Sequence, residues 1–152
     1  MHDRLAEIAA RIDEGLDDCW RIASQGHALS KARKRLDAGE AARELQQITS
    51  ASETPPAAGT ALAETVEALQ AQLSSAQRMD NAISDAQAQL RLIDARLDEA
   101  AARAIELSVD AGDGSALAEL TTLSDDVDGL VGDLEALRQG MEETARPATG
   151  SA

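Results

Sequence analysis

The most constraining feature of this chain is a heptad pattern that runs from Ala61 to Val109 without a glycine or a proline. Its register holds for seven heptads, with only Thr65 and Gln72 placing longer polar side chains at core positions. Such a pattern predicts one long helix, over 61–109, that packs against other helices. The a and d positions of this helix are Leu62, Thr65, Leu69, Gln72, Ala76, Met79, Ile83, Ala86, Leu90, Ile93, Leu97, Ala100, Ala104 and Leu107.

The composition excludes most alternatives to a helical fold. The chain has 152 residues, of which 32 are Ala and 18 are Leu, whereas it has 4 Val, 7 Ile and no Phe or Tyr. A β-sandwich or barrel needs β-branched and aromatic residues, and a doubly wound α/β domain needs Val- and Ile-rich strands. We therefore expect an all-α protein built from strong helix formers.

The N-terminal part of the chain carries a second heptad pattern. Its core positions predict a long helix over about 3–37, and a short helix over about 40–48 follows a stop signal at Asp37–Glu40. Residues 49–60, rich in Ser, Pro, Ala and Gly, predict a linker between this segment, 1–48, and the rest. The core positions of the long helix are Leu5, Ile8, Ile12, Gly15, Cys19, Ile22, Gly26, Leu29 and Leu36.

The C-terminal part predicts a further long helix over about 115–145, with Ser115 as its cap. The short break before it suits an antiparallel coiled-coil hairpin over 61–145, and residues 146–152 are expected to form a disordered tail. The predicted fold is thus an elongated antiparallel coiled-coil bundle of three long helices and one short helix. Ten residues form the expected packing seam of the hairpin: Ile83, Leu90, Ile93, Leu97, Leu120, Leu123, Val127, Leu130, Leu134 and Leu137.

A second stripe on the first helix is the candidate binding face. Leu16, Trp20, Ala23 and His27 lie at helical spacing beside the heptad seam, and Trp20 is the only aromatic residue of the chain. One interpretation places this stripe inside the bundle, between two neighbouring helices. The other makes it a surface for a protein partner, anchored by Trp20, because Trp is enriched at interface hot spots.

The charge balance limits the partners. The formal net charge is −14, which disfavours nucleic acid and anionic membranes as ligands. The one basic cluster, Lys31 to Arg35, is expected to complement the C-terminal end of its helix and to pair with acidic residues of later helices. No apolar run is long enough to cross a bilayer.

No motif indicates chemistry at a catalytic or metal site. His2, His27 and Cys19 lack ligand spacing for zinc, and the Asp110–Ser115 segment fails as a calcium loop at most ligand positions. Cys19 falls on the heptad seam, so a small buried hydrophobe is expected there. We therefore expect no enzymatic activity, no cofactor, no metal and no small-molecule substrate.

The sequence resembles no family through a motif that can be quoted. The predicted function is that of a non-enzymatic coiled-coil scaffold or adaptor, which acts by helix–helix interaction and self-association. One alternative is an acidic regulatory or chaperone-like subunit that masks a surface of a partner protein. A membrane-associated amphipathic coiled coil is a weaker alternative. The single cysteine and the charged N-terminus favour a cytoplasmic location, and the Ala and Arg excess is typical of a bacterial protein.

Overall fold

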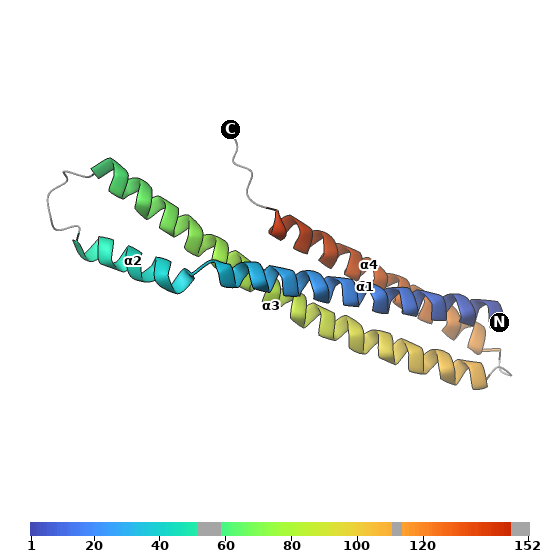
Figure 1. Cartoon of the computed structure of the whole chain (residues 1–152). Helices are drawn as coiled ribbons and strands as arrows, with labels where there is room; N and C mark the ends of the chain where they lie inside the picture. Colours follow the sequence, from blue (N-terminus) through green and yellow to red (C-terminus); the bar gives the residue numbers. More distant parts are fainter. Residues whose placement is uncertain (52–58, 111–113, 147–152) are drawn as a thin grey trace. The chain divides into compact units, whose positions relative to one another are not determined.

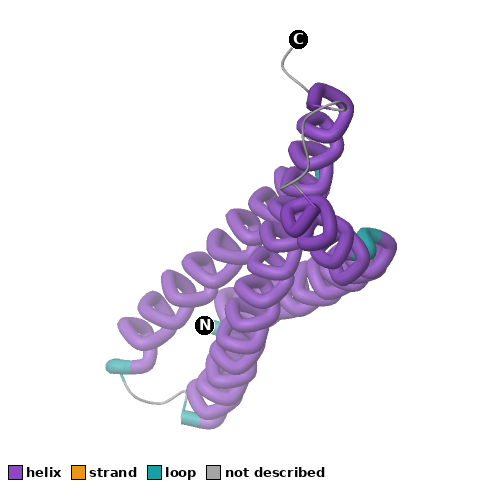
Figure 2. Tube along the Cα trace, turned by 90° about the vertical axis from the view of Figure 1, so that its left-hand side faces the viewer, coloured by secondary structure: helices purple, strands orange, loops and turns teal. Residues whose placement is uncertain are grey.

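The structure, a computed structural model, describes residues 1–51, 59–110 and 114–146. The described residues form four α-helices and no strand (Figures 1 and 2). The all-α helical-bundle class predicted from the sequence is therefore confirmed. The helices are α1 (His2–Arg35), α2 (Ala38–Ala51), α3 (Gly59–Val109) and α4 (Ala116–Ala145).

The junction of α1 and α2 differs from the predicted stop signal. Asp37 acts as the N-cap of α2, since its Oδ1 accepts the backbone N–H of Glu40 at 2.9 Å and its carbonyl accepts that of Ala41 at 3.0 Å. Gly39 lies in the first turn of α2 and has no positive φ. The residues read as a break therefore cap the next helix, and α2 begins at Ala38.

The ends of α4 have separate causes. Ser115 occupies the N-cap position, but its side chain forms no capping hydrogen bond, contrary to the expectation from the sequence. Arg146 is extended, with φ −67° and ψ 125°, and its N–H donates to the Glu142 carbonyl. Pro147 follows in the sequence, and a proline disfavours helical backbone at the preceding residue, so α4 ends there.

Two segments expected from the sequence, the linker and the tail, lie mostly outside the described residues. Residues 49–51 belong to α2 and residues 59–60 to α3, whereas 52–58, the middle of the predicted linker, lie outside the described residues. Residues 147–152 of the predicted tail also lie outside them. The linker and the tail remain predictions.

The chain divides into two compact units. Unit 1 comprises Met1–Gly26 and Ser84–Ala152, and unit 2 comprises His27–Ile83. Unit 1 thus holds most of α1, the second half of α3 and all of α4, whereas unit 2 holds the end of α1, α2 and the first half of α3. The boundary passes through two helices and not through the predicted linker.

Unit 1 is a three-helix bundle with two clusters of core residues. One cluster joins Ile8 and Ile12 of α1 to Leu107 of α3 and Leu120 of α4. The other joins Ile22 of α1 to Ala86 and Ile93 of α3 and to Met141 of α4. Rising residue numbers on α1 therefore match falling numbers on α3 and rising numbers on α4, so α3 runs antiparallel to both other helices (Figure 1).

The tightest layer of unit 1 lies at Gly15. A Cβ atom added there would stand 3.2 Å from Leu97 Cδ1 and 3.8 Å from Leu134 Cδ1. Both leucines are 0% exposed. Because Gly15 has no side chain, α1 approaches α3 and α4 closely enough for these two leucines to fill the centre of the bundle.

Unit 2 has a smaller core. Leu29 of α1, Ala41 of α2, and Leu69 and Ala76 of α3 are its buried apolar residues among those described. The basic end of α1 pairs with α3 as expected, because Arg33 contacts Asp80 through Nε–Oδ1 at 2.9 Å and Nη2–Oδ2 at 3.0 Å. Arg33 Nη1 also donates to the Leu36 carbonyl at 3.3 Å, at the C-terminal end of α1.

The two units also differ in net charge. Unit 1 carries 8 basic and 21 acidic residues, a formal net charge of −13, whereas unit 2 carries 6 basic and 7 acidic residues, a net of −1. Nearly all of the net negative charge of the chain therefore belongs to unit 1.

Candidate functional site

A three-helix bundle has three grooves, and charged side chains occupy two of them in unit 1. The groove between α1 and α4 is bridged by an ion pair between Arg11 and Asp128. Two turns away, Arg4 Nη1 lies 3.5 Å from Thr121 Oγ1. The cavities of this groove, of about 200 and 40 Å³, are also lined by charged side chains of both signs, among them Glu7 and Asp125.

The groove between α3 and α4 is lined by charges of both signs. Its cavity of about 250 Å³ is bordered by Arg96, Glu99, Arg103 and Asp126, with Ala100, Leu123 and Leu130 at its floor. A partner that entered here would have to remove these groups from water, which costs free energy unless each finds a new partner.

The groove between α1 and α3 differs from the other two because six of its eight lining residues are apolar. It has a volume of about 300 Å³, and its charged lining residue is Asp13. Ile105 is 66% exposed at its edge. An apolar groove with an exposed large side chain is the kind of surface that an amphipathic helix covers. The lining residues are Leu5, Ala9, Ile12, Asp13, Ala101, Ala104, Ile105 and Ser108.

The heptad register explains why this groove is open. With Leu5 and Leu90 at a positions, Ala9 of α1 and Ala101 and Ser108 of α3 fall at e positions, directly beside the packing seam. Small side chains at these places leave space between the helices. Ile105 falls at a b position, one step further from the seam, which is why the core does not bury it.

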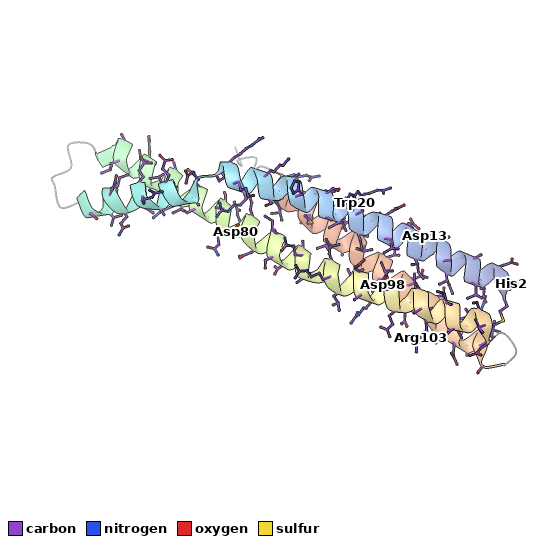
Figure 3. All side chains as sticks on the ribbon, turned by 60° about the horizontal axis from the view of Figure 1, so that its bottom comes forward. His2, Asp13, Trp20, Asp80, Asp98 and Arg103 are labelled. Carbon is purple, nitrogen blue, oxygen red and sulfur yellow. The ribbon has the colours of Figure 1, made fainter. Side chains whose placement is uncertain are left out.

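The stripe predicted as a binding face continues the α1 wall of this groove. Leu16 and Trp20 follow Ala9 and Asp13 at the same e and b positions, so the four residues share one face of α1. Figure 3 shows Asp13 and Trp20 on α1 and Asp98 on α3. Leu16 is 37% exposed and Trp20 is 75% exposed, so Trp20 is not packed inside unit 1.

The other two residues of that stripe lie further along α1. Ala23 is exposed in unit 1, and its position continues the same face. His27 is also exposed but is the first residue of unit 2. The described contact surface of unit 1 therefore contains Leu16, Trp20 and Ala23.

The residues of the predicted packing seam lie mostly in the core of unit 1. Leu90 and Leu137 are half-buried and pack against the second core cluster, and Ile83 is half-buried in unit 2. The remaining seven are buried in unit 1: Ile93, Leu97, Leu120, Leu123, Val127, Leu130 and Leu134.

Cys19 is the one cysteine of the chain and the thiol that could act as a nucleophile. Burial raises the pKa of the Cys19 thiol, and the carboxylates of Asp94 and Asp18 raise it further. The thiolate, which is the nucleophilic form, is therefore disfavoured at neutral pH. Within the described ranges, no three His, Cys, Asp or Glu side chains come together as metal ligands would.

The sequence predicts the adjacent stripe from Leu16 to His27 but not the α1/α3 groove itself. The heptad pattern places Leu5, Ile12 and Ala104 on packing seams and gives Ile105 no role. The signal was present, because an isoleucine at a b position of a long heptad pattern adds a second apolar stripe beside the first. That stripe becomes a groove only when an adjacent helix supplies Ala9 and Asp13, and the sequence did not specify which helices are adjacent.

Comparison of the chain with protein-family models, with curated proteins and with solved structures found no match in any of the three. None of the helices in the described parts of the chain has the length and apolar character needed to span a membrane.

Proposed function

We propose that this chain is a non-enzymatic helical adaptor or scaffold that binds a helix of another polypeptide in the α1/α3 groove of unit 1. The observation that carries the proposal is the contrast among the three grooves. Charged side chains of both signs line two of them, whereas apolar side chains line the third. A fourth helix laid there would complete a four-helix bundle.

The available apolar surface supports a modest but specific affinity. Burying an exposed Ile side chain contributes about 1.5–3 kcal/mol, and Trp20 adds a large amphipathic contact. Ordering and immobilisation costs offset part of this gain. Such an interface suits an adaptor that assembles and releases, in a cytoplasmic setting. The bound helix can come from a second copy, as in self-association, or from a different protein.

The charge of unit 1 supports a second candidate, an acidic regulatory subunit that masks a basic surface of a partner. A net charge of −13 on one unit attracts a cationic protein and speeds association at low salt. Both candidates bind through unit 1, and they differ in whether apolar contact in the groove or the negative charge provides most of the attraction.

A synthetic peptide of about 20 residues tests the adaptor proposal. Its apolar stripe is Leu and Ala, its other positions are uncharged Gln, and it lacks Trp, so fluorescence reports on Trp20 alone. We expect binding by calorimetry and a blue shift of Trp20 emission. If the peptide does not bind and light scattering shows a monomer at low micromolar concentration, the proposal is wrong.

A further inference from the structure

The charged side chains around the α1/α3 groove are predominantly acidic. On α1, the e and b positions of unit 1 include Asp13 and contain no Lys or Arg. On α3, Asp98 and Asp94 occupy the corresponding positions about two and three turns before Ile105, and Arg91 is the one basic residue among them. Asp94 lies near enough to α1 to raise the pKa of the Cys19 thiol.

Resting on the proposed function, we infer that the groove takes a cationic amphipathic helix of a partner protein and not a second copy of this chain. Its apolar stripe would cover Ile105 and the small residues of the groove, and its flanking Lys or Arg side chains would face Asp13 on one side and Asp94 and Asp98 on the other. Such an arrangement pairs opposite charges at a partly desolvated rim, where they give specificity and fast association.

Electrostatics argue against a second copy as the occupant. Unit 1 has a net charge of −13, so two such units pressed together would place like charges at a common rim. Like-charge contacts of this kind suppress association. The cationic partner removes this repulsion while filling the same apolar space.

The length of the apolar surface sets the size of the partner helix. Along α1 the surface extends from Leu5 to Trp20, which at 1.5 Å per residue is about 22 Å. A helix of about four turns covers this distance, and the exposed Trp20 lies at one end of it. Trp20 is the only tryptophan, so its emission reports whether that end is covered.

The experiment compares the Gln peptide described above with two versions that carry Lys or Glu beside the same apolar stripe. At low salt we expect the Lys peptide to bind the full chain at least tenfold more tightly than the Glu peptide, with a blue shift of Trp20 emission. This advantage should decrease as added salt shortens the Debye length from about 10 Å at 0.1 M to about 3 Å at 1 M.

Two pairs of variants locate the site. Ile105→Gln keeps the charge and removes the apolar edge, so we expect at least fivefold weaker binding of the Lys peptide. Leu92→Gln is the matched control, because Leu92 is 52% exposed, does not line the groove and lies about 140° around the same helix from Ile105. The double variant Asp13→Asn, Asp98→Asn should reduce the preference for the Lys peptide over the Glu peptide. The control double variant Asp126→Asn, Asp133→Asn on α4 changes the net charge by the same amount and should retain most of that preference.

The outcomes separate this inference from the proposed function. If the Gln, Lys and Glu peptides bind with equal affinity, the cationic-helix inference is wrong and the adaptor function stands. The same holds if the two double aspartate variants lose the preference for the Lys peptide to the same extent. If sedimentation shows a dimer that Ile105→Gln dissociates, the occupant is a second copy and the inference is also wrong. If no peptide binds and the chain is a monomer, both proposals fail. Circular dichroism confirms that each variant remains helical.

Discussion

Unit 1 and unit 2 use the same types of residue but bury them to different extents. In unit 1, three helices enclose two clusters in which Leu97 and Leu134 are fully buried. In unit 2, the buried apolar residues among those described are two leucines and two alanines. The units also differ in charge, with −13 against −1.

This difference shows how a thin Ala and Leu core depends on how many helices lie side by side around it. In unit 2 the end of α1 and then α2 follow one another along α3 (Figure 1), whereas in unit 1 three helices lie side by side. A third helix lets one leucine contact two neighbours at once, so each buried side chain loses more contact with water. Unit 1 gains enough burial in this way to tolerate an excess of acidic residues that repel one another. That excess is what makes its one apolar groove selective for a cationic partner in our proposal.

The largest expected effect comes from removing a central leucine of unit 1. Leu97→Ala leaves a cavity between α3 and its neighbours, so we expect a loss of about 2–5 kcal/mol in the free energy of unfolding. Leu69→Ala is the matched change in unit 2 and should cost about 2 kcal/mol or less, since fewer groups surround the side chain. Urea unfolding followed by circular dichroism measures both. Equal losses would contradict the comparison of the two cores.

A side chain at Gly15 should have the next largest effect. In Gly15→Val the new atoms would collide with Leu97, whose Cδ1 and Cδ2 lie 3.2 and 3.3 Å from an added Cβ. Overpacking of this kind costs about 1–3 kcal/mol in unfolding free energy. Gly132→Val is the control, because nothing lies within 4 Å of a Cβ added there. If the two variants unfold at the same urea concentration, α1 does not approach α3 and α4 as described.

The glycines on the open side of α4 should respond in the opposite direction. Gly129 and Gly132 lie inside the helix, and an added Cβ would meet nothing within 4 Å at either position. Gly129→Ala and Gly132→Ala should each raise the free energy of unfolding by about 0.5–1 kcal/mol, because glycine costs this much relative to alanine in a helix. Thermal unfolding measures this stabilisation, and a midpoint lower than that of the unchanged protein for either variant would contradict the prediction.

The sequence was sufficient to predict the class of fold and most of the core. The heptad register placed Ile93, Leu97 and Leu134 on helix-packing faces, because period alone determines which residues share a face. It also placed Gly15 and Gly26 on the seam of α1, although it gave no reason for them. The reason is tertiary, since Leu97 and Leu134 approach Gly15 from other helices, and Met141 approaches Gly26.

Local ambiguity explains the errors at the helix ends and the missed groove. Asp37 and Gly39 suit either the end of one helix or the start of the next, and here Asp37 caps α2 through its bond to the Glu40 N–H. The sequence alone allows Trp20 either an internal or an interface role, because its stripe has the same period as a core face. Exposure of Trp20 follows from there being two neighbours of α1 in unit 1, both on the side of Gly15.

The smallest expected effect is the change in unfolding free energy when an interhelical ion pair of either unit is removed. Arg33 and Asp80 in unit 2 are 25% and 52% exposed, and Arg11 and Asp128 in unit 1 are 45% and 46% exposed. Pairs this exposed contribute about 0–1 kcal/mol. Asp80→Asn should lower the unfolding free energy by about 0.5 kcal/mol, because unit 2 is nearly neutral and loses an attraction.

Asp128→Asn should change the unfolding free energy by about zero at low salt, since losing the pair is offset by removing one of the 21 acidic residues of unit 1. Added salt should reduce the difference between the two variants, because it screens both the pair and the general repulsion. Urea titrations at two salt concentrations measure this difference. A larger loss for Asp128→Asn than for Asp80→Asn would mean that the single contact outweighs the net repulsion, and that the charge of unit 1 has little influence on its stability.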